Sequence, residues 1–182
     1  MVRRGTVGKS KSTYDNIVEY IIENQQKFYR IAYCYVYNKD SALDIVQNAI
    51  CKALEHYHSL RNPDAVKTWF YRILVNESLT YIKKNGREIV CEPTELKEEI
   101  YYEPKFEPGF AIYDEINKLS KEMQTVVMLH FFEQLTLKEI SEVTGVNLNT
   151  VKSRLYAALS KLEEGLKEEY YDGQSKKAKA SR

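Results

Sequence analysis

The sequence predicts an all-α protein made of two small helical domains, a three-helix core and a four-helix domain with a helix-turn-helix, joined by a flexible acidic linker. Three observations lead to this prediction. Charged residues make up 29% of the 182 positions, with only 7 Gly and 4 Pro, a composition that favours helices. Apolar residues recur every three or four positions on both sides of one stretch where this period fails. Each side is long enough for only a small core.

The first predicted domain spans residues 14–87 and follows a basic N-terminus, residues 1–13, which we expect to be disordered. Its first helix starts near Ser12 and has one apolar face formed by Ile17, Ile21, Phe28, Ile31 and Tyr35. A second helix, capped by Asp40 or Ser41, is predicted to turn inward Leu43, Val46, Ile50, Leu54 and Tyr57.

The third helix is predicted to start at Asn62 and Pro63, because proline suits the first helical position. Asn85 and Gly86 form its stop signal. We expect it to complete the three-helix core with Val66, Phe70, Ile73, Leu74 and Ile82.

The linker spans residues 88–109 and carries three of the four prolines. Seven Glu against Lys97 and Lys105 give it a net charge of −5, a composition typical of a solvated, disordered tether. Fully extended, it would reach about 73 Å, which is about two turns of B-DNA. The two domains could therefore read separate sites on one duplex.

The second predicted domain spans residues 110–170, and its helical pattern restarts at Ser120. Thr136 and Glu139 form a capping-box pattern before a short helix that ends at Gly145, and Asn147 can cap the next helix. The predicted buried positions are Ile112, Ile116, Leu119, Val126, Val127, Leu129, Phe131, Leu137, Ile140, Val143, Val151, Leu155, Leu159 and Leu162. Two helices joined by such a turn predict a helix-turn-helix. The basic tail, residues 171–182, is expected to be disordered.

The last helix of this domain carries the clearest functional signal. Opposite its buried row, helical geometry places Asn149, Thr150, Ser153, Arg154, Tyr156 and Ala157, with Lys152 at the border. No acid follows Glu142 in the stretch up to Leu162, although the whole chain has a net charge of only +1. Phosphates would repel an acidic side chain on an inserted helix. The pattern therefore predicts a helix that enters a DNA groove, although such a helix pair can also be purely structural.

Two segments together resemble a known family. The stretch "ALDIVQNAICKALEHYHSLRNPDAVKTWFYRILVNESLTYIKK" resembles region 2 of the extracytoplasmic-function sigma factors of the sigma-70 family. The stretch "LSKEMQTVVMLHFFEQLTLKEISEVTGVNLNTVKSRLYAALSKL" is similar to their region 4. With the linker, the resemblance covers about residues 14–166. It implies an alternative sigma factor that binds core RNA polymerase and directs promoter-specific transcription initiation. The segments are most similar to those of subgroups that respond to cell-envelope stress.

The resemblance also implies three sets of contacts. The residues expected to dock on the clamp of the largest polymerase subunit are Asp44, Ile45, Val46 and Gln47. Those expected to contact the minus-ten element are Leu60, Arg61, Asn62, Trp69, Arg72, Asn76, Lys83 and Lys84. Those expected to contact the minus-thirty-five element are Asn149, Thr150, Lys152, Ser153, Arg154 and Tyr156.

The residues themselves agree with the minus-ten assignment. From Arg61 to Arg87, six cations face two acids, with Trp69, Tyr71 and Tyr81 interspersed, and cations with aromatics suit single-stranded DNA. The family pattern is broken at Ala157 and Ala158, where a basic residue is common, and we therefore expect fewer DNA contacts there.

Partners and location follow from the same resemblance. We expect promoter DNA, core polymerase and an anti-sigma factor, often membrane-bound in this family, but no catalysis, cofactor, metal or small-molecule substrate. The chain has no run of about 18 apolar residues and no secretion signal, so a cytoplasmic location is expected. Its three cysteines lack metal or disulfide spacing, and we expect Cys34 and Cys51 to be buried.

Other classes of protein stay open at this point. A one-component repressor would use residues 14–86 for a ligand or for dimerisation. An enzyme is disfavoured because His56, His58 and His130 lack a carboxylate or nucleophile constellation. A purely helical interaction module is disfavoured by the acid-free helix. The tyrosine run from Tyr29 to Tyr37 could meet an anti-sigma factor, although packing within the first domain explains it more simply.

Overall fold

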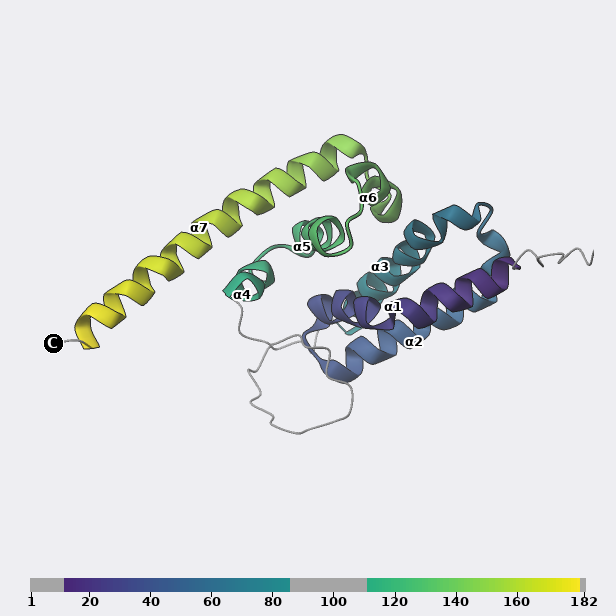
Figure 1. Cartoon of the computed structure of the whole chain (residues 1–182), viewed down its shortest axis with the longest axis horizontal. Helices are drawn as coiled ribbons and strands as arrows, with labels where there is room; N and C mark the ends of the chain where they lie inside the picture. The colour runs from purple at the N-terminus through teal and green to yellow at the C-terminus, as the bar shows by residue number, and fades with distance from the viewer. Residues whose placement is uncertain (1–11, 86–110, 181–182) are drawn as a thin grey trace, which may run out of the picture.

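The computed structural model describes residues 12–85 and 111–180, and this part of the chain contains helices and no strand (Figure 1). The first group is α1 (Thr13–Val36), α2 (Lys39–Glu55), two 3-10 turns (Tyr57–Ser59 and Pro63–Ala65) and α3 (Val66–Asn85). The second group is α4 (Ala111–Asn117), α5 (Lys121–Val127), the π-helical turn η3 (Met128–Phe132), α6 (Leu137–Thr144) and α7 (Leu148–Ala180).

Helix α1 forms as its sequence predicts. The hydroxyl of Ser12 accepts a hydrogen bond from the backbone N–H of Asp15, whose carboxylate accepts one from the N–H of Ser12, so both ends of the capping box are satisfied. All five predicted inward residues are buried, and the ring of Phe28 lies 4.2 Å from that of Phe70 in α3, measured between centroids. Aromatic rings that are buried against each other contribute strongly to core stability.

Helix α2 differs from the prediction in its cap and in its inner face. Asn38, not Asp40 or Ser41, is the cap, and its side chain accepts from the N–H of Ser41. The buried residues are Ala42, Ile45, Val46, Ala49 and Ala53, whereas Leu43 is 48% exposed. The prediction followed the large apolar residues, but the three alanines let neighbouring helices approach closely, and Leu43 is turned about 100° from this row.

Helix α3 begins as predicted, with the side chain of Asn62 accepting from the N–H of Asp64. Phe70 and Leu74 are fully buried. Tyr71, which was predicted to be one of the aromatics of a DNA surface, is also fully buried. The remaining predicted core residues of this helix are half-buried, namely Val66, Ile73 and Ile82.

The second group keeps its predicted caps. Ser120 caps α5, Thr136 and Glu139 form a complete capping box on α6, and Gly145 ends α6 with a φ of 71°. Phe131 was expected to be buried but is 53% exposed. The reason is the π-helical turn η3, whose wider winding shifts the register after Leu129.

Helix α7 buries a row that differs from the predicted one at a single position. Val151, Leu155, Ala158 and Leu162 are buried, and Leu159 is 38% exposed. The helix also continues to Ala180, through residues that we expected to be disordered. Alanines and lysines near its end are good helix formers, so propagation from a formed helix is favourable.

Several expectations fall outside the described residues, namely the disorder of residues 1–11, the acidic linker and Cys91. Cys34 is buried as expected, and burial raises the pKa of its thiol to about 12. Cys51 is exposed, so that part of the expectation is wrong. Among the described helices, none is long and apolar enough to cross a membrane.

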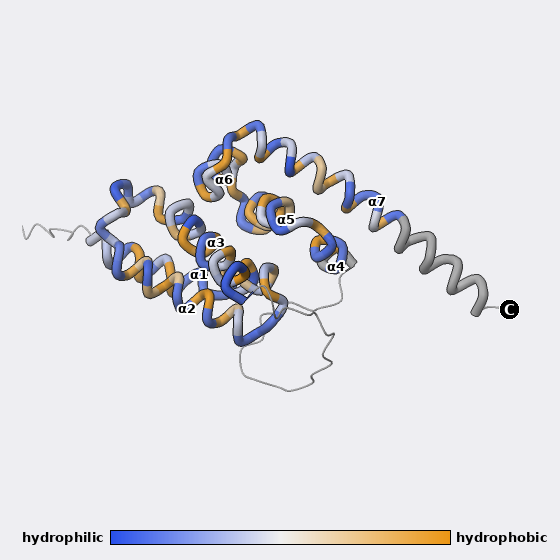
Figure 2. Tube along the Cα trace, turned by 180° about the vertical axis from the view of Figure 1, so that it is seen from behind, coloured by the Kyte–Doolittle hydropathy of each residue, from blue (hydrophilic) through white to orange (hydrophobic). Residues whose placement is uncertain are grey.

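The two groups of helices lie against each other. Helix α6 packs on α3, and the remainder of the second group is assembled around α5 and the first half of α7 (Figure 1). Figure 2 shows apolar positions recurring at short intervals among hydrophilic ones along the helices of both groups.

Candidate nucleic-acid interface

Helices α6 and α7 form the predicted helix-turn-helix. Gly145 supplies the left-handed backbone of the turn, and the hydroxyl of Ser141 donates to the carbonyl of Val146 across it, at 2.6 Å. Asn147 then caps α7 by accepting from the N–H of Thr150, at 2.8 Å. These contacts fix the angle between α6 and α7.

The exposed face of α7 has the composition that a groove-binding helix needs. Asn149, Lys152 and Ser153 are exposed, and the ring of Tyr156 is 68% exposed. No residue between Leu148 and Leu162 is acidic. The face therefore offers a cation, an amide, hydroxyls and an aromatic ring without a carboxylate to repel phosphates.

Two other predicted contacts lie on the flank of this face. Thr150 is half-buried, and its hydroxyl binds the side chain of Asn147 at 3.1 Å. Arg154 is half-buried, and its charge acts on Glu122 at the start of α5. Hydrogen bonds from its own backbone N–H and from Ser120 lower the pKa of Glu122, and the charge of Arg154 lowers it further. Glu122 was not foreseen, since nothing in its spacing links it to α7.

The departure from the family pattern at Ala157 and Ala158 affects the predicted DNA surface less than expected. Ala158 is fully buried and forms part of the core, whereas Ala157 is half-buried. A basic side chain could not occupy the position of Ala158 without disturbing the packing of α7. Only Ala157 bears on the DNA surface.

A second polar surface follows α3. Trp69, Arg72, Asn76 and Lys83 are spaced by three, four and seven residues, so they share one face of the helix. Arg72, Asn76 and Lys83 are exposed, and Trp69 is half-buried. The indole N–H of Trp69 donates to the hydroxyl of Ser59 at 3.0 Å, and this bond holds the loop before α3 against the helix.

The other predicted minus-ten residues differ in how exposed their side chains are. Arg61, Asn62 and Lys84 are exposed, and Asn62 also caps the turn that leads into α3. Leu60 is only 6% exposed. Its side chain supports the loop from within and is not available to a ligand.

The predicted polymerase-docking stretch on α2 is only half exposed. Asp44 and Gln47 are exposed, but Ile45 and Val46 are part of the core. Leu43, four positions before Gln47, lies on the same outer surface. Leu43, Asp44 and Gln47 are therefore exposed together, whereas two of the four consecutive residues of the prediction cannot be reached by a partner.

No group of three or more His, Cys, Asp or Glu side chains with metal-binding geometry exists among the residues the structure describes. His56 and His58 are exposed, and His130 is half-buried with its Nδ1 2.9 Å from the carbonyl oxygen of Leu135.

The two helical groups coincide with two known family models. Residues 21–88 match the model of Sigma-70 region 2, and residues 109–162 match that of Sigma-70 region 4. RNA polymerase sigma factor SigV of Bacillus subtilis is 39% identical over 157 residues, which cover 83% of this chain and 91% of that protein. The chain belongs to the sigma-70 family.

This sigma factor belongs to the extracytoplasmic-function group. The ECF RNA polymerase sigma-E factor of Haemophilus influenzae is 29% identical over 135 residues, 66% of this chain and 71% of the relative. The fold also matches the sigma factor RpoE of Bartonella quintana, solved with the anti-sigma factor NepR, with a TM-score of 0.68 and 22% identity over 84% of this chain and 97% of RpoE. The predicted family and the all-helical fold are thus confirmed.

Two nearby asparagines of this sigma factor should differ in their effect on stability. We expect Asn147→Ala to destabilise the second domain by about 1 kcal/mol, because an N-cap hydrogen bond is lost. Asn149→Ala, two residues on and exposed, should leave stability within about 0.5 kcal/mol. Urea unfolding measures both variants. Equal destabilisation by the two substitutions would contradict the assigned cap.

Proposed function

We propose that this chain is an alternative sigma factor that binds core RNA polymerase and directs initiation at promoters of a cell-envelope stress response. The observation that carries the proposal is the acid-free exposed face of α7 in a helix-turn-helix, combined with a second cationic and aromatic surface on α3. One DNA-binding surface would suit a repressor. Two different ones in a chain of the sigma-70 family suit a protein that reads two promoter elements.

The proposed roles are assigned mainly to those predicted residues whose side chains are exposed. Asn149, Lys152, Ser153 and Tyr156 read the minus-thirty-five element in the major groove, with Arg154 and Thr150 at its edge. The surface of α3 with Trp69 and the loop before it take the minus-ten element. On α2, the outer surface of Asp44, Gln47 and Leu43 docks on the clamp of the largest polymerase subunit.

Energetics explain why the sigma factor needs the polymerase. Separating DNA costs about 1.4 kcal/mol per stacked step. A base captured on an aromatic surface returns roughly 1 to 3 kcal/mol. One surface of the size of α3 cannot offset the opening of many base pairs, so melting depends on the much larger enzyme.

Regulation by an anti-sigma factor is part of the proposal. The similar RpoE was solved in a complex with the anti-sigma factor NepR. A protein that presents two separate binding surfaces can be silenced by a partner that covers both. In this chain the proposed inhibitor has to reach α2 or α3 and the exposed face of α7.

Run-off transcription tests the proposed function. Core polymerase with the chain is expected to give discrete transcripts from a subset of genomic promoter fragments, including the region upstream of its own gene. Core polymerase alone supplies the control. A gel shift of the free chain on a palindromic site, without any polymerase-dependent transcript, would favour a one-component repressor instead.

A further prediction concerns the free chain. Permanganate should find no reactive promoter thymines when the sigma factor is present without core polymerase, because one captured base cannot offset a melted bubble. Reactivity should appear when core polymerase is added. Reactive thymines with the free chain would contradict the division of labour proposed above.

A further inference from the structure

The outer side of α1 carries a row of apolar side chains that none of the proposed roles uses. Tyr14, Val18 and Ile22 follow one another at intervals of four residues, so they lie in one line along the N-terminal half of the helix. Tyr14 is 41% exposed, Ile22 is 64% exposed and Val18 is half-buried. We call these three residues the apolar ridge.

An acidic residue follows each member of the apolar ridge. Asp15, Glu19 and Glu23 repeat at the same interval of four residues, and all three are exposed. They form a second line, the acidic row, which is turned about 100° around the helix from the ridge. Together the six side chains line one hollow on the surface of α1.

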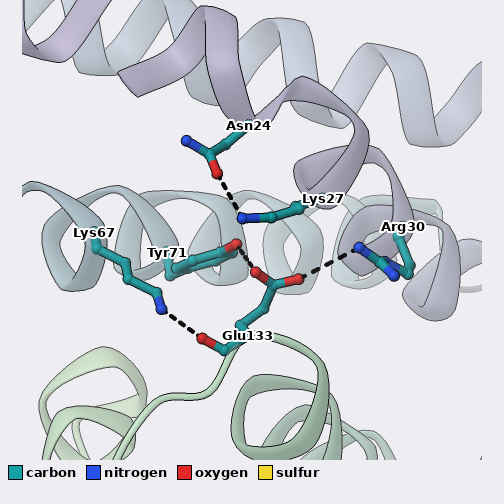
Figure 3. Close-up of polar contacts among 6 residues, drawn as sticks. All are labelled: Asn24, Lys27, Arg30, Lys67, Tyr71 and Glu133. Atoms are coloured by element: carbon teal, nitrogen blue, oxygen red, sulfur yellow. Dashed lines mark hydrogen bonds and ion pairs between the residues drawn. The ribbon is translucent and has the colours of Figure 1, made fainter. Parts of the chain in front are cut away.

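This part of α1 contains no cation to balance its acids. Residues 12–26 include three acids and no Lys or Arg, so their net charge is −3. The next two cations along the helix bind elsewhere. The ammonium group of Lys27 donates to the side-chain oxygen of Asn24 at 2.9 Å, and a guanidinium nitrogen of Arg30 lies 4.0 Å from the carboxylate of Glu133 (Figure 3).

The second group of helices contacts the first at a distance from the apolar ridge. The buried carboxylate of Glu133 faces Arg30 in the second half of α1 and accepts from the hydroxyl of Tyr71. Its backbone carbonyl accepts from Lys67 (Figure 3). Helix α1 begins at the end of the first group that is farther from α4 and α5 (Figure 1). The ridge is therefore open to solvent while the two groups are packed together.

The apolar ridge is supported from below by the core. The ring of Tyr14 meets the ring of Tyr57 edge-on, with 5.3 Å between their centroids. Ile17 and Ile21, which directly precede two members of the ridge, are buried. A partner would thus meet a preformed surface and lose little free energy in ordering it.

The charge beside the ridge indicates what kind of ligand fits. Carboxylates repel the phosphates of DNA and of anionic lipids, so both are disfavoured here. A row of Lys or Arg on a partner is attracted by the acidic row, and an apolar row next to it can pack on the ridge. An α-helix provides two such rows at the required four-residue spacing, as in coiled coils, where charges beside an apolar seam select the partner.

We propose that the apolar ridge and the acidic row form a docking site for a cationic amphipathic helix of a partner protein. The apolar side chains of that helix pack on the ridge, and its Lys or Arg side chains pair with the acidic row. Both rows extend over about 12 Å of helix, so the contact is small and reversible. No residue assigned above to DNA or to the polymerase belongs to this site, and the site does not depend on the proposed function.

Fluorescence anisotropy with two designed peptides tests the docking site on the full chain. Both peptides are alanine-based helices with three leucines four residues apart. Each leucine is followed by lysine in one peptide and by glutamate in the other. The lysine peptide is expected to bind the wild type at sub-millimolar concentrations, and the glutamate peptide is not. Equal binding of the two peptides, or no binding of the lysine peptide, would overturn the proposal.

Two substitutions at the site are compared with matched substitutions outside it. Ile22→Ala removes an exposed apolar side chain and Glu23→Lys reverses a charge, so each should weaken binding of the lysine peptide about tenfold. The controls Phe131→Ala and Glu142→Lys make the same kinds of change at exposed positions of the second group and should bind like the wild type. Circular dichroism checks that each variant is folded. Site variants that bind as well as their controls would contradict the assignment.

Two other occupants of the ridge are tested with the same variant. Sedimentation velocity of the full chain without peptide detects self-association, and flotation with vesicles of phosphatidylglycerol and phosphatidylcholine detects membrane binding. Ile22→Ala is expected to behave like the wild type in both measurements. Self-association or vesicle binding that Ile22→Ala abolishes would assign the ridge to a second copy of the chain or to a lipid surface, and would overturn the proposal.

Discussion

Replacing Arg154 by alanine is expected to lower transcription from the promoters of this sigma factor by about 10- to 100-fold. An arginine contact to a base edge is worth about 1 to 3 kcal/mol, and Arg154 is a half-buried cation at the edge of the acid-free face of α7. Run-off transcription on a dependent promoter measures the loss. Affinity for core polymerase should be unchanged, because the proposed docking surface lies on α2.

Lys167→Ala is the matched control for Arg154→Ala. It also removes a cation from α7, about 20 Å further along the helix, where its ammonium group pairs with Glu163 at 2.6 Å. This exposed pair should contribute little to stability, so transcription should stay within about twofold of the wild type. An equal loss of polymerase binding by Arg154→Ala would refute the role given to α7.

The largest expected loss of stability comes from Phe70→Ala. Phe70 is fully buried, and its ring lies 4.2 Å from that of Phe28 and 6.2 Å from that of Tyr20. Removing a buried phenyl ring leaves a cavity between α1 and α3, and such substitutions cost about 3 to 5 kcal/mol. Urea unfolding followed by circular dichroism should show an early transition for the first domain.

Phe131→Ala tests whether burial or residue type decides the loss of stability. Phe131 is 53% exposed after the π-helical turn, so its removal should change the free energy of unfolding by less than about 1 kcal/mol. The sequence pattern alone predicts the opposite, because it places both phenylalanines in a core. Comparable destabilisation by the two substitutions would contradict the register that follows η3.

Local rules on capping and periodicity predicted most of the fold. The helix start near Ser12, the capping box at Thr136, the turn at Gly145 and the cap at Asn147 depend on neighbouring residues only, and each is present. The errors occurred where packing overrides local pattern. The alanines of α2 take the inner face from Leu43, and Ala158 takes the place of Leu159, because close helix packing favours small side chains.

The candidate site was predictable in its chemistry and less so in its exposure. The exposed face of α7 follows from helical spacing, but the burial of Leu60, Ile45 and Val46 depends on neighbours distant in sequence. Glu133 carries no signal at all in the sequence, since its partners lie 62 to 103 residues earlier in the chain. Contacts between domains arise from tertiary structure, which one-dimensional patterns do not encode.

The central claim is that this chain works as a subunit of RNA polymerase, and direct binding to the purified core enzyme tests it best. The chain, labelled with a fluorophore at Lys167→Cys on α7 in a variant lacking the three native cysteines, should show a saturable rise in anisotropy with one chain per enzyme. Unlabelled wild type should compete with it. No rise at micromolar core polymerase, with a folded chain, would contradict the account.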